Sequence, residues 1–432
     1  MKINYANSRI NAKQIRILEK RLEPERARLI QAAKTEYLDD RASINLCCDK
    51  TMMKTVKKII QLTQSLNPVY LVVVGIGGSN LGSIAVQEAI LGKYYNQLRP
   101  KLQVLYADTV DTDAMNAVIT LITPALKKRK KVILNVVSKS GSTTETIANF
   151  EVLLDVVQKY QTKYADSVVV TTNKNSKLWN LGVEKGFTVL EIPEKVGGRY
   201  SVLSPVGLYP LGLLGINISE LLKGAFKMRS NCLRPLKSNP AAKLAMILYA
   251  HYKQGKTIAD LFLFSNGLEG LGKWYRQLIA ESLGKEFNNQ NKRINTGITP
   301  IVSVGSTDLH SMVQLYLGGP CNEMTMFVDV ATNKETIKVP KMNEFNELVP
   351  GIQGKSLKVI MDAILQGTLI AFKKTKRPFV TLELANKKPF MIGQFLQLMM
   401  MMTMYLGHLL DVNPFDQPNV ETYKIETKRL LK

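Results

Sequence analysis

The chain has 432 residues, of which 45% are hydrophobic, and it carries a formal net charge of +23. This length suits two domains better than one, and the composition indicates a soluble globular protein with a large core. The positive charge suits nucleic acid, an anionic membrane surface or small anionic substrates, but the lysines are spread along the chain without a basic tail, so no specific nucleic-acid partner is expected.

The first part of the chain, residues 1–65, is expected to be helical, because it shows polar periodicity and few strand-forming residues. Its start lacks the apolar stretch of a signal peptide. Apolar, β-branched runs then alternate with helical stretches, which predicts a parallel sheet with right-handed crossovers. The predicted strands cover residues 69–74, 102–106, 132–137, 168–171 and 188–192.

A second series of strands is predicted farther along the chain, at residues 258–264, 300–304, 324–330 and 378–384. The Pro/Gly-rich passage 205–215 and the polar stretch 228–239 are expected to join the two halves. We therefore predict an α/β protein with two doubly wound parallel-sheet domains, a helical N-terminal segment and a C-terminal helix. The expected boundaries are residues 1–65, 66–220, 221–410 and 411–432.

Two features bear on where the protein resides. The stretch from Phe390 to Leu410 is apolar enough for a membrane span, but Gln394 and Gln397 within it favour a buried core helix, and no membrane partner is expected. The four cysteines, at positions 47, 48, 232 and 321, have no C-x-x-C spacing, so neither a disulfide framework nor a zinc site is predicted. Reduced thiols and a cytoplasmic location fit this pattern best.

The most informative segment is the loop from Ser138 to Glu145, with the sequence SKSGSTTE. It follows a buried strand and precedes a helical stretch, and it offers five hydroxyl groups, one ammonium and one glycine. Hydroxyls, a lysine and the free N–H groups of a helix start together favour a phosphate site. The simpler interpretation is an N-cap at Ser142 with Glu145 completing a capping box, and the two interpretations are compatible.

A second glycine-rich loop, residues 75–82 with the sequence GIGGSNLG, follows the first predicted strand. It misses the dinucleotide fingerprint, because Asn80 stands where the third glycine should be. It also misses the nucleotide P-loop, because Ser83 replaces the required lysine. Ligands of open parallel sheets bind at the carboxyl ends of the strands, so loops 75–82 and 138–145 are both candidates to face one site.

Arg199 and Glu281 are candidates for acid–base chemistry. Arg199 lies in Gly197-Gly198-Arg199-Tyr200-Ser201, where paired glycines can present its guanidinium to an oxyanion, although a surface arginine in a turn is the commoner case. Glu281 ends a predicted helix, where the negative end of the helix dipole favours its action as a base; an exposed structural glutamate is again commoner.

Two further candidates lie late in the chain. His310 is the one histidine of three on a predicted loop at the carboxyl end of a strand, which makes it the histidine expected to act in catalysis. The C-terminal segment Asn413 to Lys424 contains two prolines and places Glu421 and Lys424 on one face of a final helix. An ordinary surface ion pair between them is the alternative.

Taken in order, six motifs resemble those of the glucose-6-phosphate isomerase family. They are GIGGSNLG, SKSGSTTE, GGRYS, ESLGK, the loop ending in His310, and FDQPNVETYK. The resemblance covers Gly75 to Lys424 and implies two sugar-isomerase domains and reversible isomerisation of glucose 6-phosphate and fructose 6-phosphate. It implies a homodimer and neither a cofactor nor a metal. The loop SKSGSTTE is shared by sugar-isomerase domains in general, so the other motifs carry the family assignment.

The same resemblance implies roles for individual residues. Arg199 resembles the arginine that stabilises the enediolate, and Glu281 resembles the base that moves the proton between C2 and C1. His310 and Lys424 resemble the pair that opens the sugar ring. The substrate-binding positions of the family correspond to Gly78, Ser79, Ser138, Lys139, Ser140, Thr143 and Gln417.

Pro418-Asn419 departs from the Trp-Gly that many members have, and Ser140 replaces a threonine. Asn419 can adopt a glycine-like left-handed turn, so a small local effect is expected. The alternatives to the isomerase are a sugar-phosphate sensor that uses only the loop 138–145, a nucleic-acid-binding protein, and an isomerase that also accepts mannose 6-phosphate.

Overall fold

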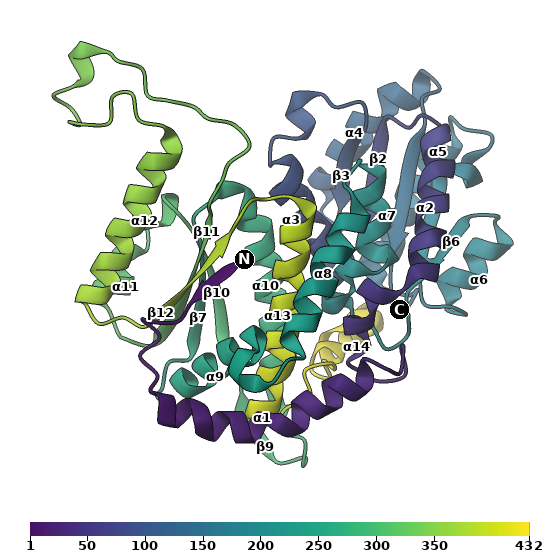
Figure 1. The fold of residues 1–432 in the computed structure, drawn as a ribbon. Helices are drawn as coiled ribbons and strands as arrows, with labels where there is room; N and C mark the ends of the chain where they lie inside the picture. The colour runs from purple at the N-terminus through teal and green to yellow at the C-terminus, as the bar shows by residue number, and fades with distance from the viewer. Residues whose placement is uncertain (432) are drawn as a thin grey trace.

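Two five-stranded sheets, with helices packed between them, organise the computed structural model, which describes residues 1–431 (Figure 1). The sheet near the C-terminal label in Figure 1 comes from the first half of the chain, and the sheet on the other side comes from the second half and the N-terminus. The predicted α/β class with two mainly parallel sheets is confirmed.

All neighbouring strands of the first sheet are parallel. Its spatial order is β3 (Gln103–Ala107), β2 (Tyr70–Val74), β4 (Val132–Val137), β5 (Val168–Thr172) and β6 (Thr188–Glu191). Each predicted strand of this series is present within one or two residues. The direction of winding reverses between β2 and β4, so the loops that follow these two strands lie next to each other, where doubly wound sheets bind ligands.

The second sheet contains the four predicted parallel strands and one strand that the sequence did not reveal. Its order is β1 (Lys2–Asn4), β12 (Phe379–Leu384), β11 (Glu323–Val330), β7 (Ile258–Leu263) and β10 (Thr299–Val304). β1 pairs antiparallel with β12, so the expectation that the whole of residues 1–65 is helical is wrong at its start. A three-residue strand is too short to show a periodicity, and only its pairing with β12 creates it.

The helices cover both sheets. Those around the first sheet are α2 (Lys50–Ser65), α3 (Leu81–Leu91), α4 (Thr112–Lys127), α5 (Thr144–Gln158) and α6 (Lys177–Glu184). The others are α1 (Ala12–Ala32), α7 (Pro205–Leu213), α8 (Ile218–Cys232), α9 (Pro240–Tyr252), α10 (Glu269–Leu283), α11 (Val313–Gly318), α12 (Leu357–Lys374), α13 (Pro389–Leu410) and α14 (Val420–Leu430). A short antiparallel hairpin joins β8 (Lys285–Phe287) and β9 (Arg293–Thr296).

The passage 205–215, which the sequence predicts to join two domains, is not a loop. It forms α7, whose residues are almost all buried, with Pro205 at the first helical position, where proline needs no hydrogen-bonded N–H. One hydrophobic cluster includes residues of β2, α7, β7 and α13. The two sheets therefore share a core instead of being separated by an exposed linker.

α13 runs through the middle of this core (Figure 1). Within residues 1–431 it is the one helix that is long and apolar enough to cross a membrane, and 94% of its most apolar window is buried inside the protein. Gln397 is fully buried in it. The prediction of a buried core helix for this segment is confirmed.

Candidate functional site

The glycine-rich loop after β2 lies against the segment that carries Arg199. A Cβ atom added to Gly78 would come within 2.3 Å of the carbonyl carbon of Gly198, so this close backbone contact requires glycine. The hydroxyl of Ser201 donates to the carbonyl oxygens of Gly198 (2.7 Å) and Gly78 (3.4 Å). The half-buried Ser79 belongs to the same loop. The contact fixes the 3-10 helix η5 (Gly198–Leu203) at the carboxyl edge of the first sheet.

Arg199 is 2% exposed, and every nitrogen of its guanidinium donates a hydrogen bond. Nε donates to Ser282 (2.7 Å), and Nη2 donates to the carbonyl oxygens of Pro414 (2.6 Å) and Asp416 (3.0 Å). These acceptors hold two of the three guanidinium nitrogens, Nε and Nη2, in place. The planar fork of arginine suits such a fixed arrangement of acceptors.

The third nitrogen, Nη1, faces side chains instead of backbone. It donates to Oε2 of Glu281 at 3.3 Å and to Oε1 of Gln417 at 2.8 Å. The Glu281 side chain is 32% exposed, while that of Arg199 is 1% exposed. Gln417 is exposed. A substrate oxygen can therefore approach Nη1 by displacing a side chain, without breaking the backbone contacts of Arg199.

Glu281 lies in the last turn of α10, as the sequence predicted. Gln277, one turn earlier, donates from Nε2 to Oε1 of Glu281 at 3.0 Å. One carboxylate oxygen is thus held by an amide and the other by the guanidinium of Arg199. The carboxylate is oriented and partly exposed, and within residues 1–431 Arg199 is the one cation that forms an ion pair with it. These are properties that a general base needs.

Lys139 and Lys285 surround Arg199 with positive charge. Burial lowers the pKa of Lys139, and the nearby charge of Arg199 lowers it further. Burial and the same guanidinium also lower the pKa of Lys285, whose ammonium donates to the carbonyl oxygens of Glu281 and Asp416. Two lysines, each close enough to Arg199 for the guanidinium to lower its pKa, favour an anionic ligand beside them.

The hydroxyl loop between β4 and α5 is not used for capping. The N-cap of α5 is Thr143 and its side chain makes no capping bond, so the predicted cap at Ser142 with a capping box to Glu145 is wrong. The Ser138 hydroxyl bonds to that of Thr143 at 2.9 Å, and the Ser142 hydroxyl donates to that of Ser140 at 3.3 Å. The hydroxyls bond to one another at the start of α5, which leaves the helix N-terminus available to an anion.

α14 lies over this loop. Side chains of Ser140, Thr143, Lys424 and Lys428 line a cavity of about 120 Å³ between the loop and the helix. Lys424 forms an ion pair with Glu421 at 2.7 Å, which is the alternative that the sequence left open for these two residues. The structure therefore places Lys424 beside the hydroxyl loop.

His310 is separate from these residues. It is exposed and ends a 3-10 turn after β10, which is the edge strand of the second sheet. Within residues 1–431 its side chain forms no hydrogen bond or ion pair with Arg199, Glu281 or Lys424. Figure 1 shows α11, which begins three residues after His310, well away from α14.

Three residues of the site were not predicted. Ser282 and Lys285 lie inside the ESLGK motif and hold Arg199 and the segment of Asp416, and Gln277 orients Glu281 from one helical turn away. The spacing of Gln277 and Glu281 at i, i+4 was the available signal. The expected left-handed turn at Asn419 is wrong: its φ is −68°, and its side chain donates to Glu286.

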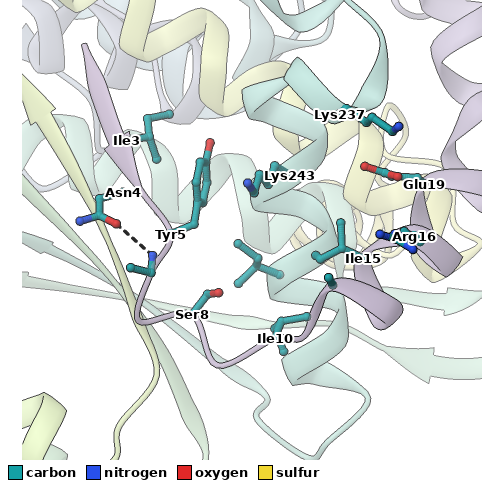
Figure 2. A pocket seen from close by; sticks show the side chains of 13 residues that line it. Ile3, Asn4, Tyr5, Ser8, Ile10, Ile15, Arg16, Glu19, Lys237 and Lys243 are labelled. Carbon is teal, nitrogen blue, oxygen red and sulfur yellow. Dashed lines mark hydrogen bonds between the residues drawn. The ribbon is translucent and has the colours of Figure 1, made fainter.

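A larger cavity, of about 970 Å³, lies elsewhere, between the N-terminal segment, α1 and α9 (Figure 2). The Lys243 ammonium lies 4.4 Å from the centre of the Tyr5 ring there. None of the predicted site residues lines this cavity. Apart from His310, the predicted site residues therefore gather around Arg199 and the hydroxyl loop and not at this larger cavity.

Comparison with known proteins gives the same assignment as the motifs. The family model described as phosphoglucose isomerase matches residues 44–432. A glucose-6-phosphate isomerase of Carboxydothermus hydrogenoformans is 35% identical over 370 residues, which are 84% of this chain and 78% of that protein. One of Fusobacterium nucleatum is 33% identical over 390 residues, covering 89% and 84% of the two chains.

Solved structures share the whole fold. A Thermus thermophilus protein described as hypothetical superposes with a TM-score of 0.89 at 30% identity, over 100% of this chain and 99% of the other. A glucose-6-phosphate isomerase from Chlamydia trachomatis has a TM-score of 0.81 at 21% identity, over 99% and 88% of the chains. The motifs, the site around Arg199 and the relatives agree: the chain belongs to the phosphoglucose isomerase family.

Proposed function

We propose that this protein interconverts glucose 6-phosphate and fructose 6-phosphate by proton transfer through an enediolate. The observation that carries the proposal is the contact of Glu281 and Arg199, a partly exposed carboxylate 3.3 Å from a buried guanidinium at the ligand-binding edge of a doubly wound sheet. Isomerisation needs a base next to a carbonyl and a cation where charge develops on oxygen, and this pair supplies both.

In the proposed reaction Glu281 takes the proton from C2 of the open-chain aldose and returns it to C1. Nη1 of Arg199 donates to the oxygen on which negative charge develops. Because the other two nitrogens of Arg199 are held by Ser282 and by backbone carbonyls, the guanidinium is preorganised and does not have to reorient during the reaction. Gln417 contacts Nη1 in this structure, and it would contact the sugar instead of Nη1 when substrate is bound.

The hydroxyl loop is the proposed anchor for the phosphate. Ser138, Lys139, Ser140 and Thr143 would bind it at the start of α5, with Gly78 and Ser79 contacting the substrate from the neighbouring loop. Binding the unreactive phosphate orients the sugar carbons at Glu281. Burial lowers the pKa of Lys139, and the charge of Arg199 lowers it further, so an incoming dianion would stabilise the charged ammonium; this supports the role.

We propose that His310 and Lys424 open the sugar ring and that the protein works as a homodimer in the cytoplasm. The exposed His310 has no contact with its own Arg199 cluster within the described residues, which supports completion of the site by a second subunit. Mixing inactive Glu281→Gln and His310→Ala dimers tests this. Regained activity after subunit exchange supports shared sites, and a mixture that stays inactive contradicts them.

The decisive experiment for the function is the Glu281→Gln variant in an assay of fructose 6-phosphate conversion. Its kcat should fall by on the order of 10² to 10⁴ while substrate affinity stays near the wild-type value, because the amide keeps the shape but cannot take a proton. The matched control is Glu269→Gln in the first turn of the same helix, where Glu269 pairs with lysines instead.

Two results would contradict the proposal. A Glu281→Gln enzyme that keeps full turnover would remove Glu281 as the base. A wild-type protein that binds fructose 6-phosphate but never converts it would be a sugar-phosphate sensor.

A further inference from the structure

The helical turn before α2 carries two adjacent thiols that take no part in the proposed isomerisation. Cys47 and Cys48 end the 3-10 helix η1 (Ala42–Cys48), and their sulfur atoms lie 3.9 Å apart. Cys47 is half-buried and donates to the carbonyl oxygen of Ile44, whereas Cys48 is exposed. Cys48 is therefore the thiol that a reagent from solution can reach.

These thiols stand at one side of a cavity of about 890 Å³ between α2 and α8. Its apolar wall includes Met53, Leu222 and Phe226, and the Phe226 side chain is 49% exposed. An apolar cavity of this size has room for the organic part of a small molecule attached to Cys48.

Lysines surround the same cavity. Lys50, Lys54, Lys57 and Lys58 follow one face of α2 and line it, and Lys223 reaches it from α8. Lys223 pairs with Glu220, but within residues 1–431 the four lysines of α2 form no ion pair. Asp49 is the one acidic residue in the lining, and it is engaged in capping α2 and in a bond from Tyr37. The lining of the cavity thus combines apolar and cationic side chains.

The two thiols differ in acidity because they share one contact. When Cys48 is a thiolate, the one S–H of Cys47 can turn from the Ile44 carbonyl to the Cys48 sulfur. This hydrogen bond lowers the pKa of Cys48, with Arg229 acting in the same direction against burial. The same contact raises the pKa of Cys47. The thiolate is the form that attacks a disulfide, so the exposed sulfur is also the more reactive one.

We propose that Cys48 is a thiol–disulfide exchange site for small anionic disulfides, which the lysines of α2 attract and the cavity accommodates. The Cys48 thiolate attacks one sulfur of the disulfide R–S–S–R. A Cys48–S–S–R bond forms, the original S–S bond breaks, and R–S⁻ leaves with the electron pair. The R group then lies in the cavity beside Phe226, and an excess of a small thiol reverses the reaction.

The chain supplies an internal control, because Cys321 is also exposed but lies outside this cavity. The test compares the two cysteines in the full-length protein by peptide mass spectrometry after brief exposure to a dianionic aromatic disulfide, dithiobis-nitrobenzoate, or to the neutral dithiodipyridine. With the anionic reagent Cys48 should react on the order of tenfold faster than Cys321, as electrostatic steering at close range allows. With the neutral reagent this advantage should shrink.

Two variants separate the contribution of the lysine charges from that of the Cys47 hydrogen bond. Lys54→Met with Lys57→Met should slow the anionic reagent at Cys48 and leave the neutral one unchanged, and added salt should mimic this effect. Cys47→Ala should slow both reagents, because the thiolate loses its hydrogen bond. Equal rates at Cys48 and Cys321, or a lysine variant that reacts like wild type with the anionic reagent, would overturn the proposal, whether or not the protein isomerises sugar phosphates.

Discussion

Arg199 is held by acceptors of two kinds, and this difference is the main feature of the site at the scale of single residues. Backbone carbonyls and the buried Ser282 fix Nε and Nη2, while Nη1 contacts the partly exposed Glu281 and the exposed Gln417. A buried guanidinium is stable only if its donors are satisfied. The same bonds that stabilise the fold therefore also orient the cation proposed to act in catalysis.

A substitution of Ser282, which positions the guanidinium of Arg199, tests this arrangement. Ser282→Ala leaves Nε of Arg199 without its acceptor and should lower the free energy of unfolding by about 1–3 kcal/mol. Because the guanidinium then loses its orientation, kcat should fall more than KM rises. Chemical denaturation and steady-state kinetics measure both effects.

The control is Ser230→Ala, since the exposed Ser230 bonds only within its own helix. A Ser282→Ala variant with normal stability and normal kcat would show that Nε does not orient Arg199.

At the scale of elements, the site depends on how closely two loops approach. Gly78 has no room for a side chain, because a Cβ would lie 2.3 Å from the backbone of Gly198. Gly78→Ala should push η5 away from the sheet, lower the melting temperature and reduce kcat by displacing Arg199. Thermal unfolding and activity of the same preparation test this.

Gly367→Ala is the matched control for the loss of a glycine. Gly367 lies in α12, and a Cβ there meets no atom within 4 Å, so the variant should gain about 0.5–1 kcal/mol of stability and keep its activity. Equal behaviour of the two variants would mean that the contact at Gly78 is not required.

α14 is the helix that lies over the hydroxyl loop. It has no buried residues, and it lines the small cavity over the hydroxyl loop. Lys428→Met should raise KM for fructose 6-phosphate about fivefold with little change in kcat, because one nearby cation contributes on the order of 1 kcal/mol to binding a phosphate.

Arg429→Met removes a cation from the same helix at a position that does not line the cavity, and it should leave KM unchanged. If both variants raise KM equally, the effect comes from the general charge of α14 and not from a contact of Lys428 with the phosphate.

At the scale of the whole molecule, the second sheet contains a buried carboxyl group outside the site. Glu323 is 5% exposed at the start of β11, one of its oxygens has no hydrogen-bond partner, and burial raises its pKa to about 7 against the opposing charge of Arg377. In the unfolded chain a glutamate has a pKa of about 4.3. The folded protein thus retains a proton that the unfolded chain has lost.

This difference predicts a pH dependence of stability. The contribution of Glu323 is fully present below pH 4 and declines as the pH rises through about 7. Glu323→Gln should therefore be more stable than wild type at pH 8 by about 1–3 kcal/mol, with the advantage vanishing towards pH 4. Urea unfolding at several pH values measures the difference, with the exposed Glu151→Gln as control. If the difference in unfolding free energy between Glu323→Gln and wild type does not vary with pH, Glu323 is not the group whose pKa is raised by folding.

Most of the fold could be predicted because parallel strands buried on both faces leave a clear pattern of apolar, β-branched runs between helices. β1 and the buried α7 could not. β1 exists only through its pairing with a strand nearly four hundred residues away, and the prolines and glycines of α7 are also typical of loops.

The sequence by itself determined which residue types are available for chemistry: the hydroxyl loop after β4, Arg199 between glycines, and Glu281 at a helix end. These are local properties, set by neighbours in the chain. The tertiary structure alone decided that Arg199 contacts both Glu281 and Gln417, that Lys424 lies beside the hydroxyl loop, and that His310 lies apart. The contact between Arg199 and Gln417, for example, joins residues 218 positions apart, so these contacts follow from how the two sheets and α13 pack together and not from any local pattern.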